Sequence, residues 1–380
     1  MSRLRVLASA RPAVAVLIAV MIGAAGCKVQ LTTATSDHGS GKAHAGKTHS
    51  GKGHTKKKHH GKSHSGKGRA AGPGTAAAGT VYTEPAAGFS PVYRLINAAK
   101  HSINLTMFEL EDTTAEHDLG AAAKRGVQVR VVLDEREKNS NSDAADYLTS
   151  HGAKVVWSST MYQYTHQKTL VTDQDRALIM SANLTSKYYP TTRDFLVEDN
   201  QKADITAITK VFDADFAHRS VTPGDGHDLV WSPTDATDRL LALINGAKKN
   251  LRVYFEEMSS SRIITALVNA AKRGVSLQLC GENEGHHYDR EFTDLADAGA
   301  RISYFHTSTG FYIHAKMVEA DYGTKNAAMF IGSENMTTNS LTRNRELGLV
   351  ISNHAALAAM VKTFAGDYSN GTHWPDGSGG

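Results

Sequence analysis

Two histidines and two lysines recur at matched spacing in this 380-residue chain. Each histidine opens an H-x-K tripeptide, in the segments HQKTLVTD and HAKMVEAD, and an aspartate closes each segment. The first copy contains His166, Lys168 and Asp173, and the second contains His314, Lys316 and Asp321. Near neutral pH a neutral imidazole is a nucleophile, a protonated imidazole is an acid, and lysine supplies positive charge. These residue types could therefore attack, protonate and stabilise one anionic substrate.

Further polar residues follow each copy in the same order. A Ser-x-Asn comes first, within MSAN and GSEN, and an acidic residue lies eleven positions beyond each Asn. The first set is Ser181, Asn183 and Asp194, and the second is Ser333, Asn335 and Glu346. One such run could arise by chance, but two matched runs indicate a duplicated functional unit.

The duplication extends beyond these motifs. LINAAK (95–100) recurs as LINGAK (243–248), and AAKRGV (122–127) recurs unchanged at 270–275. Both pairs are displaced by 148 residues, which is also the distance between the two histidines. This period is too long for a solenoid repeat. Because duplicated units commonly pack as a pseudo-twofold pair, we expect the two histidines and two lysines to converge on one site.

The hydrophobic pattern places these motifs on alternating helices and strands. We predict helices over 91–100, 114–126, 238–248 and 263–274, and strands over 101–110, 127–135, 250–258 and 275–283. Each H-x-K begins a further strand, at 165–173 and 313–321, followed by strands at 177–183 and 327–335. This alternation predicts a largely parallel sheet covered on both faces. Since residues two apart on a strand face the same side, His and Lys of each motif should point into a cleft, whereas Gln167 and Ala315 face away.

The doubled H-x-K-x4-D motif with a downstream Ser-x-Asn resembles the phospholipase D superfamily, over about residues 81–370. The resemblance implies an α/β fold of two mixed-sheet lobes, each with helices on both faces, and an active site in a pseudo-twofold cleft. We accordingly predict an N-terminal lobe at 81–225, a C-terminal lobe at 226–370 and a flexible tail at 371–380.

The resemblance also implies roles for the residues. His166 would attack phosphorus and form a phosphohistidine, and His314 would protonate the leaving alcohol and then deprotonate a water or an acceptor alcohol. The residues alone leave open which histidine does which, because the two halves are near-equivalent. Lys168 and Lys316 would stabilise charge on the phosphoryl oxygens. Asn183 and Asn335 would add neutral donors, with Ser181 and Ser333 in support, so that no metal or cofactor is required.

The acidic residues divide into two groups. Asp194 and Glu346 are suited to hold a histidine ring through its second nitrogen, in their own half or in the opposite one. Asp173 and Asp321 are expected to bond backbone groups at the end of a strand. Glu109 and Glu256 occupy equivalent strand ends and could line the cleft, although packing alone also produces equivalent positions.

Three local features complete the motif analysis. Met180 precedes the first Ser where Gly332 precedes the second, so Met180 could narrow the phosphate site. Four extra residues after Asp321 predict a longer hairpin loop. His286 and His287 are expected to be a solvent-exposed pair on a rim loop, and Cys280 an inert thiol in the core.

The N-terminal region carries a targeting signal. Arg3, Arg5 and Arg11 precede an apolar run that ends in AAGC at Cys27, which predicts a signal peptide over 1–26. AAGC resembles a lipobox, so Cys27 is a candidate for lipidation, with ordinary secretion as the alternative. Residues 27–80 are expected to form a flexible, Gly/Ser/His/Lys-rich tether.

The charge of the chain is unevenly distributed. The whole chain carries +4, residues 1–36 carry four basic groups and no acids, and residues 37–70 carry +8. Residues 71–380 therefore carry −8. The mildly acidic folded part argues against a broad nucleic-acid-binding face.

Together these features predict an exported, monomeric phospholipase D that meets the membrane through a lipid anchor and the basic tether and hydrolyses phospholipid headgroup phosphodiesters, with transfer to an alcohol as a further outcome. An extracellular metal-independent endonuclease is the first alternative, because the basic tether would attract nucleic acid. A cardiolipin synthase-like phosphatidyltransferase is the second. A catalytically silent binding module is disfavoured, since neither motif has lost its His or Lys.

Overall fold

A computed structural model describes residues 79–187 and 189–375. The predicted signal peptide, Cys27 and nearly all of the basic tether lie outside these residues, so the expectations for them stay predictions. Within the described part of the chain, no helix combines the length and apolar character needed to cross a membrane.

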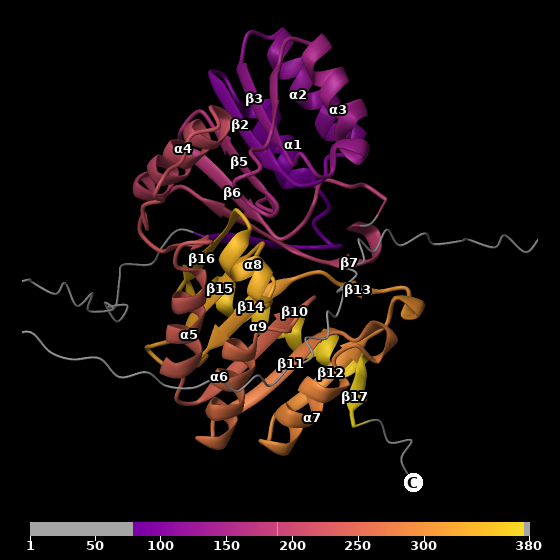
Figure 1. Cartoon of the computed structure of the whole chain (residues 1–380), viewed down its shortest axis with the longest axis vertical. Helices are drawn as coiled ribbons and strands as arrows, with labels where there is room; N and C mark the ends of the chain where they lie inside the picture. The colour runs from indigo at the N-terminus through magenta and orange to yellow at the C-terminus, as the bar shows by residue number, and fades with distance from the viewer. Residues whose placement is uncertain (1–78, 188, 376–380) are drawn as a thin grey trace, which may run out of the picture. The chain divides into compact units, whose positions relative to one another are not determined.

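The N-terminal half forms a seven-stranded sheet in the order β1-β8-β6-β5-β2-β3-β4 (Figure 1). Its strands are β1 (Thr80–Thr83), β2 (Ser102–Met107), β3 (Gln128–Leu133), β4 (Lys154–Trp157), β5 (Thr169–Thr172), β6 (Arg176–Met180) and β8 (Phe195–Asp199). Its helices are α1 (Ser90–Ala98), α2 (Thr113–Lys124), α3 (Lys138–Ser150) and α4 (Lys202–Phe216).

The C-terminal half forms an eight-stranded sheet in the order β17-β12-β11-β10-β14-β15-β16-β9. Its strands are β9 (Leu229–Ser232), β10 (Asn250–Phe255), β11 (Ser276–Glu282), β12 (Arg301–Phe305), β14 (Lys316–Ala320), β15 (Ala328–Gly332), β16 (Glu346–Ile351) and β17 (Thr372–Trp374). Its helices are α5 (Ala236–Gly246), α6 (Ser261–Lys272), α7 (Asp289–Asp297), α8 (Thr338–Arg343) and α9 (His354–Asn370).

The strand register repeats between the halves. Ser102 pairs with Gln128 in the parallel β2–β3 ladder, and Asn250 pairs with Ser276 in β10–β11, each residue displaced by 148. The sheets are mixed, as the resemblance implies, and the largely parallel sheet expected from the alternation alone is wrong. The hairpins β5–β6 and β14–β15 are antiparallel, because a short connection reverses the chain without a crossover helix. Their loops span 173–175 and 321–327, which confirms the longer second hairpin.

The repeated AAKRGV segment shows why the helices end where they do. Alanine and lysine favour the helical conformation through the last turns of α2 and α6. Gly126 and Gly274 then adopt φ values of +90° and +86°, a left-handed conformation that side chains disfavour. The chain can therefore turn directly into the buried strands β3 and β11.

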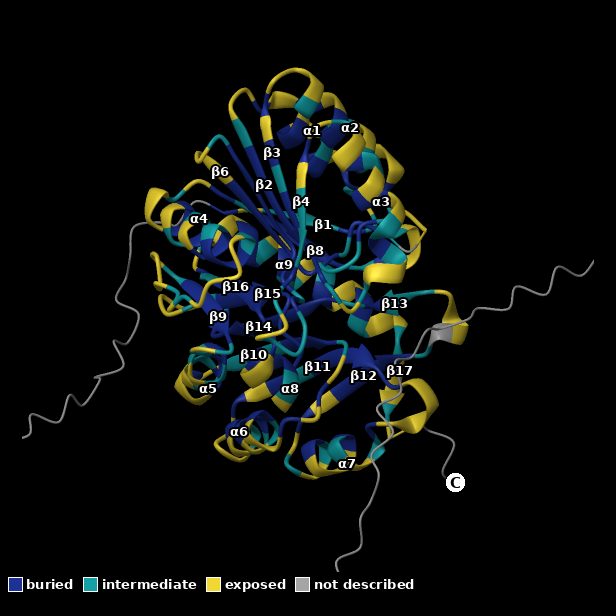
Figure 2. Ribbon diagram, turned by 45° about the horizontal axis from the view of Figure 1, so that its top comes forward, coloured by how far each residue is buried: buried dark blue, intermediate teal, exposed yellow. Residues whose placement is uncertain are grey.

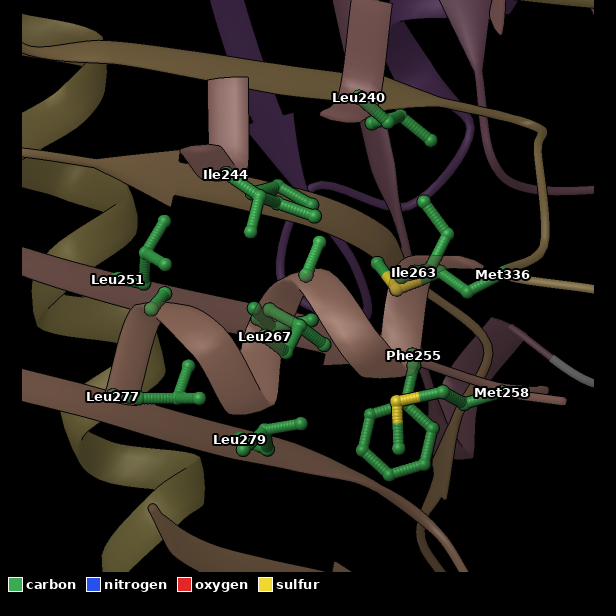
Figure 3. Packing of buried hydrophobic residues seen from close by; sticks show 14 of the residues in the cluster. Leu240, Ile244, Leu251, Phe255, Met258, Ile263, Leu267, Leu277, Leu279 and Met336 are labelled. Atoms are coloured by element: carbon green, nitrogen blue, oxygen red, sulfur yellow. The ribbon is translucent and has the colours of Figure 1, made fainter. Parts of the chain in front are cut away.

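The two halves contain three apolar cores, of which one is shared between them. One lies between the first sheet and α1–α3, and a second lies between the second sheet and α5–α7, where Leu267 of α6 packs near Leu277 and Leu279 of β11 (Figure 3). The third contains residues of both sheets and of α4 and α9, including Ile179 and Phe195 from the first half and Tyr254 and Phe364 from the second. Figure 2 shows the same layers as dark, buried strands beneath helices with exposed outer faces. Because the third core is shared, the halves bury their apolar surface against each other.

One expectation about the chain end is corrected. Residues 372–374, within the tail expected to be flexible, form β17 on the edge of the second sheet, opposite Ile302, Ser303 and Tyr304 of β12. Trp374 packs against the second core and lies near the rings of Phe292 and Tyr304. Burial of this indole explains why the segment is ordered.

Candidate active site

Two short backbone pairings place each H-x-K segment beside the opposite half. The strands β7 (Thr192–Arg193) and β13 (Tyr312–Ile313) pair in parallel across the halves, and the amide of His314 donates to the carbonyl of Arg193 at 3.1 Å. In the second pairing, Thr165 forms a parallel β-bridge with Arg345, and the backbone amide of Gln167 donates to the carbonyl of Arg345 at 3.0 Å. The residue after each of these arginines is one of the two predicted acids.

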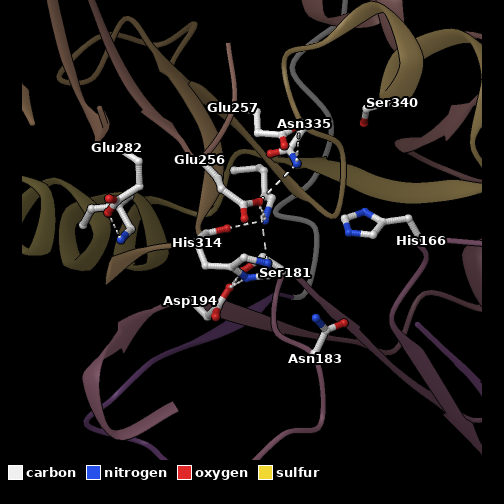
Figure 4. Close-up of polar contacts among 12 residues, drawn as sticks. His166, Ser181, Asn183, Asp194, Glu256, Glu257, Glu282, His314, Asn335 and Ser340 are labelled. Atoms are coloured by element: carbon white, nitrogen blue, oxygen red, sulfur yellow. Dashed lines mark hydrogen bonds and ion pairs between the residues drawn. The ribbon is translucent and has the colours of Figure 1, made fainter. Parts of the chain in front are cut away.

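The acids consequently pair with the histidines of the opposite halves. His166 Nδ1 lies 2.8 Å from Glu346 Oε2, and His314 Nδ1 lies 2.8 Å from Asp194 Oδ1. Figure 4 shows the two imidazole rings pointing toward one another, with Asn183 and Asn335 on either side of the space between them. The question left open by the sequence is resolved: each acid holds the ring contributed by the other half, so one site needs both.

Hydroxyl and amide groups hold the two carboxylates in place. Ser181 Oγ donates to Asp194 at 2.6 Å, a contact that the sequence analysis did not predict. Glu346 instead accepts from Ser340 Oγ at 2.6 Å and from the side-chain amide of Asn344 at 2.8 Å. The hydroxyl of Ser333 bonds to the backbone: it accepts from the backbone amide of Leu347 at 3.3 Å.

Ser340 and Asn344 were missed by the sequence analysis. They lie shortly before Glu346, on or just beyond the short helix α8, and no matching residue belongs to the first motif. A search restricted to repeated residues could not find them, because they support only one of the two acids.

The two lysines lie beneath the histidines and are fully buried. Each ammonium donates to the carbonyl of the histidine of its own motif, Lys168 at 2.7 Å. Burial, and then the positive charge of Lys316, lowers the pKa of Lys168 to about 7. Two cations thus lie close enough to repel each other, in a position where an anion would relieve the repulsion.

His166 is arranged as a nucleophile. Burial and the charge of Lys168 lower its pKa to about 4, although Glu346 opposes the change. The imidazole is therefore neutral at pH 7, and with Nδ1–H donated to Glu346 its Nε2 carries the lone pair. The side chains of His166 and His314 are 14% and 12% exposed, so a substrate can reach the ring edges.

The two motif asparagines also lie in the site, and their amides donate to glutamates. Asn183 Nδ2 lies 3.1 Å from Glu109 Oε2, and Asn335 Nδ2 lies 3.1 Å from Glu256 Oε2. The apparent equivalence of Glu109 and Glu256 is wrong. Bridges from Leu110 to Leu184 and from Met258 to Met336 fix the register, so that Glu109 corresponds to Glu257 and Phe108 to Glu256.

The suggested effect of Met180 on the phosphate site is also wrong. Met180 is fully buried in the apolar core of the first half, on the strand face opposite Ser181. At Gly332 a Cβ would lie 2.2 Å from Glu334 Oε2 and 2.6 Å from the Cα of Gly348. Glycine is needed there for the packing of β15 against β16, which explains the difference between the copies.

The remaining candidates lie outside the reacting centre. Asp173 accepts from the amides of residues 100–102, and Asp321 accepts from those of 248–250, which confirms their expected structural role. His286 and His287 are exposed. Cys280 is buried in β11, and burial raises the pKa of its thiol, in agreement with an inert core residue.

Solved structures share this fold. A polyphosphate kinase from Porphyromonas gingivalis superposes with a TM-score of 0.60 at 15% identity, over 76% of this chain and 50% of the kinase. The chain thus spans half the length of that protein. A phosphatidylserine synthase from Haemophilus influenzae Rd KW20 superposes with a TM-score of 0.58 at 12% identity, over 76% of this chain and 85% of the synthase. At these identities the likeness shows the fold alone.

Comparison of sequences gives the family. No curated protein matches the chain. The family described as cardiolipin synthase, PLD-like domain, matches residues 92–218 and 240–368. These segments cover more than half of the chain, and each contains one complete H-x-K-x4-D motif. The chain therefore belongs to the phospholipase D superfamily.

Proposed function

We propose that this protein is a phosphodiesterase of the phospholipase D type, which hydrolyses phospholipid headgroup esters through a phosphohistidine. The observation that carries the proposal is the crossed pairing of His166 with Glu346 and of His314 with Asp194, each at 2.8 Å, above two buried lysines. This arrangement supplies a nucleophile, a proton donor and fixed positive charge at one point.

The first half-reaction follows from the protonation states. The lone pair of His166 Nε2 attacks phosphorus, the bond from phosphorus to the headgroup oxygen breaks, and protonated His314 transfers its Nε2 proton to that oxygen. Lys168 and Lys316 stabilise the non-bridging oxygens as negative charge grows on them. Glu346 orients the nucleophile by accepting Nδ1–H, and Asp194 does the same for the acid.

The second half-reaction regenerates the enzyme. His314, now neutral, takes a proton from water, whose oxygen attacks phosphorus while the bond from phosphorus to His166 Nε2 breaks. Phosphatidic acid leaves, and both histidines return to their starting states. An alcohol can replace water in this step and would give phosphatidyl transfer. The likeness to a cardiolipin synthase family and to the fold of a phosphatidylserine synthase favours this second candidate.

The two histidine roles are tested by trapping the intermediate. His166→Asn should abolish turnover and any covalent phosphoenzyme. His314→Asn should lose at least about 100-fold in turnover of a phospholipid, yet still form the intermediate with a p-nitrophenyl phosphodiester, whose leaving group needs no proton. Acid-quenched samples analysed by peptide mass spectrometry locate the label. A label on His314 would reverse the assignment.

The substrate class needs a separate measurement. Purified protein is assayed in EDTA with choline-lipid vesicles, cardiolipin vesicles, plasmid DNA and bis-p-nitrophenyl phosphate, each with and without added ethanol. We expect headgroup release from vesicles, and phosphatidylethanol as the transfer product. Since the lysines supply the positive charge, activity should survive EDTA, and a strict metal requirement would refute this account.

A further inference from the structure

The pseudo-twofold symmetry of the site is broken at the end of its central strands. At the position that follows β2 and β10, the first half has Phe108 and the second has Glu256. The registers of Leu110 and Met258 fix this correspondence. One histidine therefore faces an aromatic ring where the other faces a carboxylate.

Phe108 places an uncharged ring beside the histidine and the lysine of the first motif. Its ring lies edge-on to the ring of His166, with centroids 4.7 Å apart and planes at 70°. The ammonium of Lys168 lies 4.9 Å from the centre of the same ring. Neither contact offers a hydrogen-bond acceptor to His166 Nε2, so the neutral imidazole with an accessible lone pair is favoured.

Glu256 places a carboxylate beside the histidine and the lysine of the second motif. Its Oε2 lies 2.7 Å from Lys316 Nζ and 3.6 Å from His314 Nε2, and it accepts from Asn335 at 3.1 Å. Its Oε1 accepts from the hydroxyl of Tyr312 at 2.8 Å. Although burial opposes ionisation, His314 and Lys316 lower the pKa of Glu256, so the group is a carboxylate at neutral pH.

His314 thus lies between two carboxylates. Asp194 accepts at Nδ1, and Glu256 faces Nε2. A proton on either nitrogen therefore meets a carboxylate oxygen, which lies 2.8 Å from Nδ1 and 3.6 Å from Nε2. The titratable groups that face His314 are Asp194 after β7, Glu256 and Glu257 after β10, Tyr312 in β13, Lys316 in β14 and Glu109 after β2. Lys316 is the cation among them, and Glu256 Oε2 lies 2.7 Å from its ammonium.

We propose that Glu256 is the positioning residue that makes the two histidines unequal: it keeps His314 protonated as the acid, while Phe108 leaves His166 as the nucleophile. This inference rests on the proposed function, since it assigns the halves of that mechanism. It also explains why only one histidine of a duplicated site is the nucleophile, because the crossed pairs alone would let either histidine attack.

The pH dependence of kcat/KM tests the proposal on the full protein with the vesicle substrate, whose alcohol leaving group needs a proton from His314. The rate needs neutral His166 on the acidic limb and protonated His314 on the basic limb. Glu256→Gln keeps the size of the side chain and removes its charge, so the basic limb should move to lower pH by about 1 unit or more while the acidic limb stays.

Two further variants give matched comparisons. Glu257→Gln changes the next residue, whose carboxylate reaches Asn335 at 3.4 Å. Burial, and then the charge of Glu256, raises the pKa of Glu257 to about 7, so it is ionised on the basic limb, and its removal should move that limb less. Phe108→Glu gives the first half the side chain of the second and should move the acidic limb to higher pH. If Glu257→Gln moves the basic limb as far as Glu256→Gln, or if Glu256→Gln lowers the rate equally at every pH, the assignment is overturned.

A spectroscopic titration separates this proposal from the proposed function. The imidazole ¹⁵N shifts of His314, assigned with His314→Asn, report its protonation in the absence of any substrate. Glu256→Gln should lower the titration midpoint of His314 and leave that of His166 nearly in place. This result with no turnover of any phosphodiester would refute the proposed function alone. An unmoved midpoint in an active enzyme would refute the role of Glu256 alone.

Discussion

At the scale of single residues, the site concentrates positive charge where water cannot reach it. Lys168 and Lys316 are fully buried, and a carboxylate, Glu256, pairs directly with only one of them. Lys168 donates to the carbonyl of His166 and lies over the Phe108 ring, neither of which carries a full negative charge. Burial, and then the charge of Lys316, lowers its pKa to about 7, and a bound anion would offset both effects.

Anion binding should accordingly depend on pH. A bound phosphodiester favours the charged form of Lys168, so the complex has a higher lysine pKa than the free protein and binding takes up a proton above pH 7. The affinity for dibutyl phosphate, whose own charge is constant in this range, should fall by up to about tenfold per pH unit above pH 7. Isothermal titration calorimetry between pH 6 and pH 9 measures it.

The matched control is Lys168→Arg. Arginine stays charged throughout this range, so the pH dependence of binding should flatten, whatever the change in absolute affinity. An unchanged slope in this variant would show that another group controls the binding of the anion.

At the scale of elements, the last residue of each motif fastens a hairpin to the start of the neighbouring strand. The Asp321 carboxylate accepts from the amides of Lys248, Lys249 and Asn250, at the entrance to β10. Asp173 does the same for Lys100, His101 and Ser102 at the entrance to β2. Both aspartates have positive φ, 51° for Asp173 and 60° for Asp321, a conformation that Asp tolerates better than most residues.

Asp321→Ala should therefore destabilise the fold without directly disturbing the chemistry. The variant leaves three backbone donors without their carboxylate, so the free energy of unfolding should fall by about 2–4 kcal/mol. Asp321→Asn, which keeps one oxygen acceptor, should lose less. Urea unfolding followed by circular dichroism gives the values. A loss of activity in a variant of unchanged stability would instead assign Asp321 a part in the reaction.

The elements also show how far the sequence could be interpreted. Helices α1, α2, α5 and α6 and the strands that follow them were predicted, because two copies of one pattern support each other. The crossing of Asp194 and Glu346 between the halves was not, since spacing along one copy says nothing about the facing copy. Glu109 was paired with Glu256 instead of Glu257, because neighbouring Glu256 and Glu257 offer the same residue type. The equivalence of Phe108 and Glu256 was missed for the same reason.

At the scale of the whole molecule, two ion pairs join the halves next to the site, and the second of them is buried. Arg193 binds Asp367 of α9 at 2.6 and 2.8 Å, and Arg345 binds Asp215 of α4 at 3.0 and 3.2 Å. Each arginine directly precedes an acid that holds a histidine. Both members of each pair are displaced by 152 residues between the copies, but the sequence analysis missed the pairs because spacing along one copy does not show which residues of the facing copy it contacts.

Removing one member of such a pair should affect both stability and activity. Arg345→Met leaves Asp215 buried without its cation, which should cost about 3–5 kcal/mol of unfolding free energy. Because Glu346 follows directly, kcat should fall as well. Arg345→Met combined with Asp215→Leu should recover most of the stability, as measured by urea unfolding. If the double variant is no more stable than the single one, the ion pair does not explain the loss.

The charge distribution of the whole chain leads to the last prediction, which concerns the choice between lipid and nucleic acid. Residues 37–70 carry +8 and residues 71–380 carry −8. If Cys27 is lipidated as predicted, the enzyme meets membrane phospholipid at high local concentration, whereas DNA must approach a folded part whose net charge repels it. The basic segment could offset that repulsion only at low ionic strength, because exposed charges are screened within about 8 Å at physiological salt. Plasmid cleavage by the full-length protein should therefore fall steeply between about 50 and about 200 mM NaCl, while headgroup release from neutral vesicles changes little. A variant that begins at residue 71 should release headgroup and cut plasmid poorly at every salt concentration. If it instead nicks DNA efficiently at physiological salt and leaves vesicles untouched, the protein is an endonuclease of the same superfamily.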